Sequence, residues 1–173
     1  MKVYYLTPSI DYELSSMGLK KILEKVSIMF FEKYKNRGDI PIIFNHCDIL
    51  NKNGIEAIPI VIDNRFGMNL DWFYHDTAAQ RMGRDFIYNI CDDDVLICPS
   101  TMCSAISLFS KGKKFLFVQN YSKYSIGSAE VYNYDGIITL KGYCEDYIKQ
   151  YTKVPVYSVL NDIDLKRYNC KDL

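Results

Sequence analysis

The sequence lacks an excess of charge of either sign, because 21 basic side chains are balanced by 21 acidic ones. A neutral chain has no general field to attract nucleic acid or an anionic membrane surface. The sequence also contains no apolar run long enough for a membrane span or for the core of a secretory signal. These absences predict a cytoplasmic protein that binds no nucleic acid and has no transmembrane segment.

Short motifs for metals, nucleotides and nucleophiles are missing as well. Six cysteines are present, but none form a C-x-x-C pair, and neither His46 nor His75 lies at ligand spacing from them. No G-x-G-x-x-G, P-loop or G-x-S-x-G occurs. We therefore expect scattered reduced thiols, no metal site and no cofactor. The absence of the glycine-rich motifs argues against a self-contained dinucleotide or ATP site.

What is present is a repeated alternation of short apolar runs and amphipathic stretches. In a chain of 173 residues, this pattern indicates one α/β domain of Rossmann-like type, a mainly parallel sheet flanked by helices. Residues 1–160 form the expected domain, and 161–173 are interpreted as a linker or terminal tail. The expected strands are 2–7, 56–62, 94–98, 114–118, 136–140 and 154–159.

Helices are expected where apolar residues recur at a spacing of three and four. The clearest case lies between Ser16 and Lys35, with Lys and Glu on the opposite face. A second helix has Pro41 in its first turn and ends at Asn53-Gly54. Thr77 to Gln80 has capping-box spacing and predicts a helix through Met82, Phe86 and Ile90. Further helices are expected after Ser100 and through Cys144 to Tyr151.

An open parallel sheet binds ligands beyond the carboxyl ends of its strands, where the crossover direction changes. The candidate ligand surface is therefore formed by loops that follow four strands. These loops are 7–11 together with 38–39, 63–67, 99–102 and 119–124.

Several segments, taken in order, resemble the N-terminal domain of GT-B glycosyltransferases, the retaining type with two facing Rossmann domains. The likeness lies in the opening strand, Gly38-Asp39-Ile40-Pro41 with the helix after it, and the stretch 49–57. It continues in the paired inner strands 93–99 and 115–120. Val159-Leu160-Asn161-Asp162-Ile163-Asp164 is similar to the turn that leads such chains into their second domain.

The resemblance implies one half of a GT-B architecture, which binds the sugar acceptor, while the donor nucleotide sugar needs a second domain or chain. It implies an acceptor-binding set on three loops: Gly38, Asp39, Arg65, Gln119, Asn120 and Tyr121. Amide side chains both donate and accept hydrogen bonds, which suits a hydroxyl-rich ligand. A turn glycine before a helix allows the backbone to approach a ligand closely, although it also serves as an ordinary helix breaker.

No catalytic residue is assigned. His75 is retained as a weak candidate beside Asp76, whereas His46 lies on a helix with an apolar inner face and is interpreted as a half-buried structural histidine. Asp92 to Asp94 has the spacing of metal-dependent single-domain glycosyltransferases, but precedes a strand at the end opposite the expected ligand surface. The alternative to the acceptor-binding domain is a non-catalytic Rossmann-like binding or regulatory module.

Overall fold

The computed structural model describes residues 1–7, 39–62, 73–83, 85–119, 133–140 and 142–159. These residues form a seven-stranded sheet in the order β3-β2-β1-β4-β5-β6-β7, and every neighbouring pair is parallel. The strands are β1 (Val3–Thr7), β2 (Ala57–Val61), β3 (Gln80–Arg81), β4 (Val95–Pro99), β5 (Lys113–Val118), β6 (Gly136–Leu140) and β7 (Val156–Val159). The expected Rossmann-like α/β class is confirmed.

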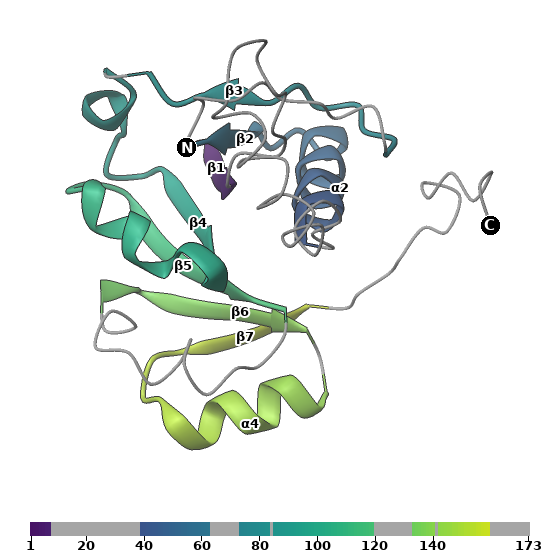
Figure 1. Ribbon diagram of the computed structural model, residues 1–173, viewed down its shortest axis with the longest axis vertical. Coiled ribbons are helices and arrows are strands. Elements are labelled where there is room, and N and C mark those ends of the chain that lie inside the picture. Colours follow the sequence, from purple (N-terminus) through teal and green to yellow (C-terminus); the bar gives the residue numbers. More distant parts are fainter. Residues whose placement is uncertain (8–38, 63–72, 84, 120–132, 141, 160–173) are drawn as a thin grey trace, which may run out of the picture.

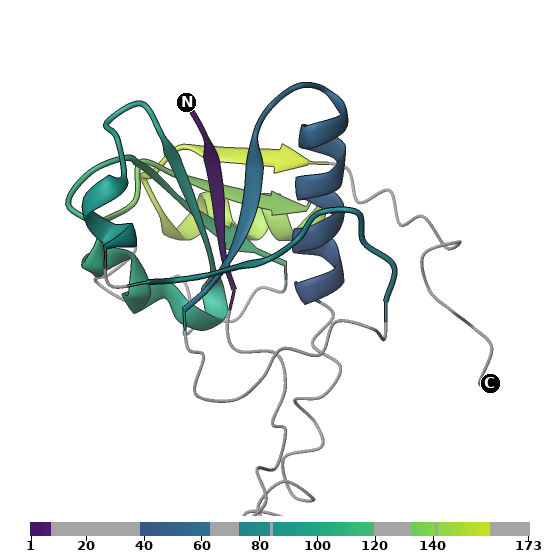
Figure 2. The same cartoon turned by 90° about the horizontal axis from the view of Figure 1, so that it is seen from above.

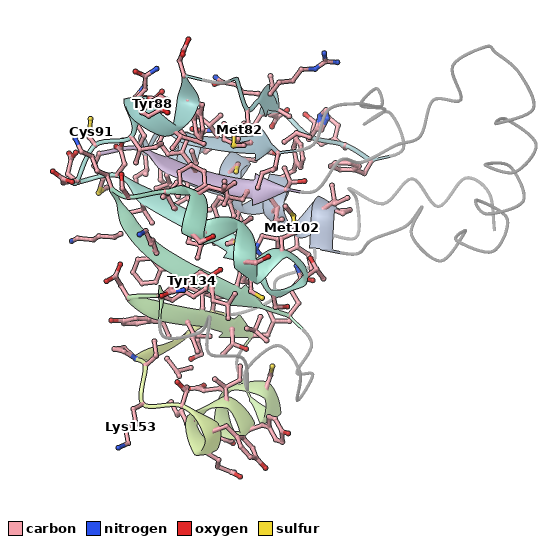
Figure 3. All side chains as sticks on the ribbon, turned by 60° about the vertical axis from the view of Figure 1, so that its left-hand side comes forward. Met82, Tyr88, Cys91, Met102, Tyr134 and Lys153 are labelled. Carbon is pink, nitrogen blue, oxygen red and sulfur yellow. The ribbon has the colours of Figure 1, made fainter. Side chains whose placement is uncertain are left out.

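Helices cover both faces of this sheet (Figures 1 and 2). The α-helix α2 (Asp39–Lys52) lies on one face, and the 3₁₀ helices η2 (Phe86–Asn89) and η3 (Ser100–Leu108) lie on the other with α4 (Tyr143–Tyr151). Figure 3 looks onto the second face, where Met82, Met102 and Tyr134 lie along it. No described helix is long and apolar enough to cross a lipid bilayer.

The hydrophobic core is divided by the sheet into two clusters. Alternate residues of each strand point to opposite faces, so β1 sends Tyr5 toward α2 and Leu6 toward η3. On the α2 side the fully buried residues include Ile43, Phe44 and Cys47 from the helix. Because both faces of the inner strands are buried, these strands read in the sequence as continuous apolar runs, as parallel strands usually do.

Helix α2 begins two residues before Pro41, which therefore occupies the first turn as expected. The helix ends at Lys52, and Gly54 follows in a left-handed conformation, with φ of 79°. The amide of Ile55 donates to the carbonyl of Leu50 across this turn. The glycine stop predicted at Asn53-Gly54 is confirmed, because only this residue type adopts such a φ without steric cost.

The helix predicted from the capping-box spacing of Thr77 and Gln80 is wrong. Gln80 and Arg81 form the short edge strand β3, paired with Ile60 and Val61 of β2, and only the 3₁₀ turn η2 follows. The physical reason lies in α2. The buried carboxylate of Asp48 accepts hydrogen bonds from the amide of Thr77 at 2.8 Å and from its hydroxyl at 2.6 Å. The capping groups of Thr77 are thus engaged with another element.

The helix expected between Ser16 and Lys35 lies outside the described residues. Ser100 is the first residue of η3, and Pro99 occupies the N-cap position. Ile106 and Phe109 are fully buried at this helix, and Met102 packs against the same core cluster. Within the described ranges, all five cysteines carry free thiols. Burial raises the pKa of the Cys98 thiol to about 12, which keeps it protonated and unreactive.

Gly136 is held between two aromatic rings on the α2 side of the sheet. A Cβ at this position would lie 2.8 Å from ring atoms of both Phe115 and Tyr157, which belong to the neighbouring strands. The two rings contact each other in a T-shaped arrangement with centroids 6.0 Å apart. The missing side chain thus allows Phe115 and Tyr157 to meet across β6.

Asp94 stabilises the edge of the sheet at which the strands begin, the amino-terminal edge. Its side chain is almost fully buried, and its two oxygens accept hydrogen bonds from the amide of Lys2 at 2.7 Å and from that of Cys91 at 3.0 Å. Asp93 pairs instead with the terminal ammonium of Met1. The triplet Asp92 to Asp94 therefore contains a backbone clamp that joins the start of β1 to the turn before β4.

We predict that Asp94→Ala lowers the free energy of unfolding by about 1–3 kcal/mol, because the amides of Lys2 and Cys91 lose the acceptor that the buried carboxylate provides. Urea denaturation followed by circular dichroism measures this change. Asp92→Ala is the matched control, since Asp92 is exposed, and its effect should stay within about 0.5 kcal/mol. Equal effects of the two substitutions would contradict the clamp.

Candidate functional site

The direction of the crossovers changes between β1 and β4. The chain leaves β1 and returns through α2 on one face, whereas it leaves β4 through η3 on the other face. Two parallel strands that separate in this way leave a crevice beyond their carboxyl ends, where open α/β sheets bind ligands. We therefore take the carboxyl edge around β1, β4 and β5 as the candidate site.

Three described side chains at this edge carry hydrogen-bonding groups. Thr7 is the last residue of β1 and is fully buried, Ser100 directly follows β4, and Gln119 directly follows β5. Ser100 and Gln119 are half-buried. Hydroxyl and carboxamide groups of this kind donate and accept hydrogen bonds without changing their charge near neutral pH.

The amino-terminal end of α2 also lies at this edge. The other end of the helix approaches the start of β2, where the side chain of Asn51 bonds both the amide and the carbonyl of Ala57 at 2.8 and 2.9 Å. Asp39, predicted as an acceptor-binding residue, is the first residue of α2. The free amides and the dipole of a helix start favour groups with negative partial charge.

The remaining predicted acceptor-binding residues, Gly38, Arg65, Asn120 and Tyr121, lie outside the described residues. Of the predicted set, the structure thus places Gln119 and the backbone of Asp39 at the carboxyl edge. The described part of this edge offers neutral polar side chains. No group of three histidine, cysteine or acidic residues suited to a metal ion occurs in the described ranges.

His75 lies away from this edge, against the flank of α2 that faces β3. Its ring stacks on Phe44 with centroids 4.9 Å apart and meets Phe73 edge to face at 5.0 Å. The Nε2 atom is buried and has no hydrogen-bond partner. Next to it, Asp48 holds the amides of Asp76 and Thr77. His75 is thus a packed aromatic group by which the segment before β3 contacts α2.

His46 lies between α2 and the sheet, on the side of α2 that faces β5. Its Nδ1 atom is 3.4 Å from the phenol oxygen of Tyr5, and its ring meets that of Phe117 edge to face at 5.3 Å. Burial lowers the pKa of His46 and raises that of Tyr5. These contacts and the lowered pKa agree with the structural role expected for this histidine.

Two contacts of this region were not anticipated from the sequence. One joins the Asp48 carboxylate to Thr77, and the other joins Tyr5 to His46. Asp48 follows Phe44 by one helical turn and is fully buried. An acidic residue at an inward helical position is the signal that would have pointed to it, because such a group needs hydrogen-bond donors from another element.

Comparisons with protein-family models, with curated proteins and with solved structures found no match. The function of the domain is therefore inferred from the topology and from the residues of the carboxyl edge.

We predict that the free energy of unfolding falls as the pH is lowered below about 6.5, the ordinary pKa of histidine. The folded pKa of His46 is lowered, so the unfolded chain binds more protons in this window and gains stability relative to the native state. The stability that the neutral His46 ring contributes is fully present above the pKa of the unfolded chain. It is lost as the pH falls toward the folded pKa, and the free energy of unfolding then changes by at most about 1.4 kcal/mol per pH unit.

Urea denaturation at several pH values, with NMR titration of the imidazole Hε1 signals, measures this effect. His46→Gln should remove the His46 contribution to the pH dependence. His75→Gln retains His46 and is the matched control. An unchanged pH dependence in His46→Gln would show that the buried ring does not carry it.

Proposed function

We propose that this domain is the acceptor-side lobe of a sugar-nucleotide-dependent glycosyltransferase of the GT-B type. The observation that carries the proposal is the switch point between β1 and β4, bordered by the neutral hydroxyl and amide groups of Thr7, Ser100 and Gln119. Together with the sequence resemblance, this edge favours a ligand rich in hydroxyl groups. Such a ligand matches alternating donors and acceptors and requires no charged partner.

In the proposed reaction, an acceptor hydroxyl attacks the anomeric carbon of a nucleotide sugar. A bond forms between the acceptor oxygen and that carbon, the bond from the carbon to the diphosphate oxygen breaks, and the hydroxyl proton leaves to a base. The half-buried side chains of Ser100 and Gln119, next to the end of β1, would bind and orient the acceptor. Fixing the hydroxyl next to the anomeric carbon lowers the entropic part of the barrier.

The donor would be bound by a second Rossmann-like lobe that faces this edge, on the same polypeptide or on another one. The described edge supports this division of labour, because its three polar side chains do not titrate near neutral pH and offer no positive charge to a diphosphate. Closure of two lobes would then exclude water from the reacting groups.

Calorimetry with a panel of uridine, guanosine, adenosine and thymidine diphosphate sugars tests this division. We expect no binding tighter than about millimolar by the domain alone, corresponding to roughly 4 kcal/mol. A micromolar affinity for one of these nucleotide sugars would contradict the acceptor-side assignment.

NMR titration with methyl glycosides and disaccharides of glucose, galactose and mannose tests the acceptor site. We expect at least one sugar to shift the amide signals of Thr7, Ser100 and Gln119, and Gln119→Ala to weaken that binding about tenfold, as loss of a good hydrogen bond does. Gln150→Ala, an exposed position on α4, is the matched control. If no sugar shifted these signals, a non-catalytic binding or regulatory module would be favoured instead.

A further inference from the structure

The two outer strands of the sheet differ in their protection against a further strand. At one side, β3 consists of only Gln80 and Arg81, both of which are polar and exposed. At the other side, β7 extends over four residues, Val156–Val159, and carries neither a charge nor a proline (Figure 1). Outer strands are normally kept from pairing by short length, charged side chains or proline. By these criteria β3 is protected and β7 is not.

The outer side of β7 presents backbone hydrogen-bonding groups at two residues. The amide of Ile137 in β6 donates to the carbonyl of Pro155 at 2.8 Å, and Ile137 is in register with Val156. Successive residues of a strand direct their amide and carbonyl groups to alternate sides, so Tyr157 bonds toward β6 whereas Val156 and Ser158 face outward. In the described part of the chain, no other strand lies beside these outward groups.

This pattern of outward groups is complementary to itself in an antiparallel arrangement. When Tyr157 faces Tyr157 of a second copy, Val156 of each copy stands opposite Ser158 of the other. The outward amides and carbonyls then form two hydrogen-bonded pairs, with the Tyr157 pair between them. Registers centred on Val156 or on Ser158 would engage only one of the two outward residues within β7. The register centred on Tyr157 is therefore the one that uses all the outward groups.

Tyr157 is the side chain that this register places on the two-fold axis. It is 53% exposed, although its ring contacts that of Phe115 edge to face with centroids 6.0 Å apart. Residues opposite each other in a non-hydrogen-bonded pair have Cα atoms about 4.5 Å apart, so the two Tyr157 rings would contact each other. Cross-strand aromatic pairs stabilise antiparallel strands. The exposed ring thus gains an aromatic neighbour across the axis.

The helix beside β7 fits the same arrangement. α4 packs on β6 and β7, and a two-fold axis normal to the sheet places the α4 helices of the two copies antiparallel. A helix over the gap between the last two strands lies about 5 Å from this axis, so the two helices are about 10 Å apart, a normal packing distance. Glu145 and Asp146 lie in the first turn of α4 and Lys149 in the last. The acidic turn of each helix therefore lies beside the basic turn of the other.

We propose that β7 pairs with β7 of a second copy of this chain, so that the two sheets join into one across a two-fold axis at Tyr157. Each tyrosine side chain buries at most about 150–250 Å². Together with one short strand pair, this is less than the roughly 1,200–2,000 Å² of a stable interface. We therefore expect a reversible dimer with a dissociation constant of about 10–100 µM. The strands β1, β4 and β5 take no part in it, so the dimer is independent of the proposed function.

Sedimentation velocity at about 5–500 µM protein tests the association, and we expect the chain to change from monomer to dimer over this range. Ser158→Pro removes an outward amide and leaves the β6 side of β7 intact, so it should weaken the dimer at least about tenfold. Tyr157→Lys places two like charges opposite each other and should have a similar effect. Tyr88→Lys, at an exposed position of η2 away from β7 (Figure 3), is the matched control and should leave the dissociation constant unchanged. Circular dichroism verifies that each variant is folded.

Disulfide trapping tests the register. In a chain that carries Cys91→Ser and Cys170→Ser, Tyr157→Cys should give a disulfide-linked dimer on oxidation with diamide, because Cα atoms about 4.5 Å apart suit a disulfide. Ser158→Cys is the matched control on the same strand. Its two Cα atoms are diagonal neighbours in this register, about 7–8 Å apart and beyond the usual range for a disulfide, so it should give little linked dimer.

Three outcomes would overturn the proposal. The first is a chain that stays monomeric at about 500 µM, which would mean that β7 is covered by another part of the chain or by a different partner. The second is a dimer that Ser158→Pro and Tyr157→Lys leave unchanged, because its interface would then lie elsewhere. The third is equal disulfide linkage at positions 157 and 158, which random collisions of exposed cysteines would produce.

Discussion

The constraint on which the structure depends is that every neighbouring pair of strands is parallel. A parallel pair cannot be closed by a tight turn, so each connection must carry the chain back across a face of the sheet. The handedness of these crossovers then determines the face that each connection covers. From this one constraint follow the change of crossover direction between β1 and β4 and the single described helix on the side of Tyr5.

The two edges of the sheet are consequently different in chemistry. At the amino-terminal edge, Asp94 and Asp93 are engaged with the backbone and with the chain terminus. At the carboxyl edge around β1, β4 and β5, Thr7, Ser100 and Gln119 are neutral and the start of α2 is present. The carboxylates of Asp93 and Asp94, whose spacing in the sequence is that of a metal site, thus belong to the scaffold. The carboxyl edge is the one suited to a ligand.

Six of the seven strands could be predicted from the sequence, because buried parallel strands are short apolar runs bounded by Pro, Asp or Gly. The strand β3 could not, since Gln80 and Arg81 are polar, exposed and paired over only two residues. The false helix after Thr77 has a related cause. Local spacing favoured a cap, but the side chain of Asp48, remote in the sequence, binds the same groups.

The candidate site was predicted at the level of topology more than of residues. Gln119 follows β5 as expected, whereas His75 lies among the rings of Phe44 and Phe73, away from the carboxyl edge. The sequence could place a residue after a strand, because strand ends are marked locally. It could not show that residues 73–77 return along α2, since this path depends on hydrogen bonds between distant segments.

The side chain of Asn51 links three parts of the fold. Its carboxamide bonds the backbone amide and carbonyl of Ala57, as the backbone of a neighbouring strand would. It also donates to the hydroxyl of Thr77, which in turn donates to Asp48. The last turn of α2, the first residue of β2 and the approach to β3 therefore share one hydrogen-bond network. Fraying of that helical turn would release all three together, so this corner of the domain behaves as a single cooperative unit of local unfolding.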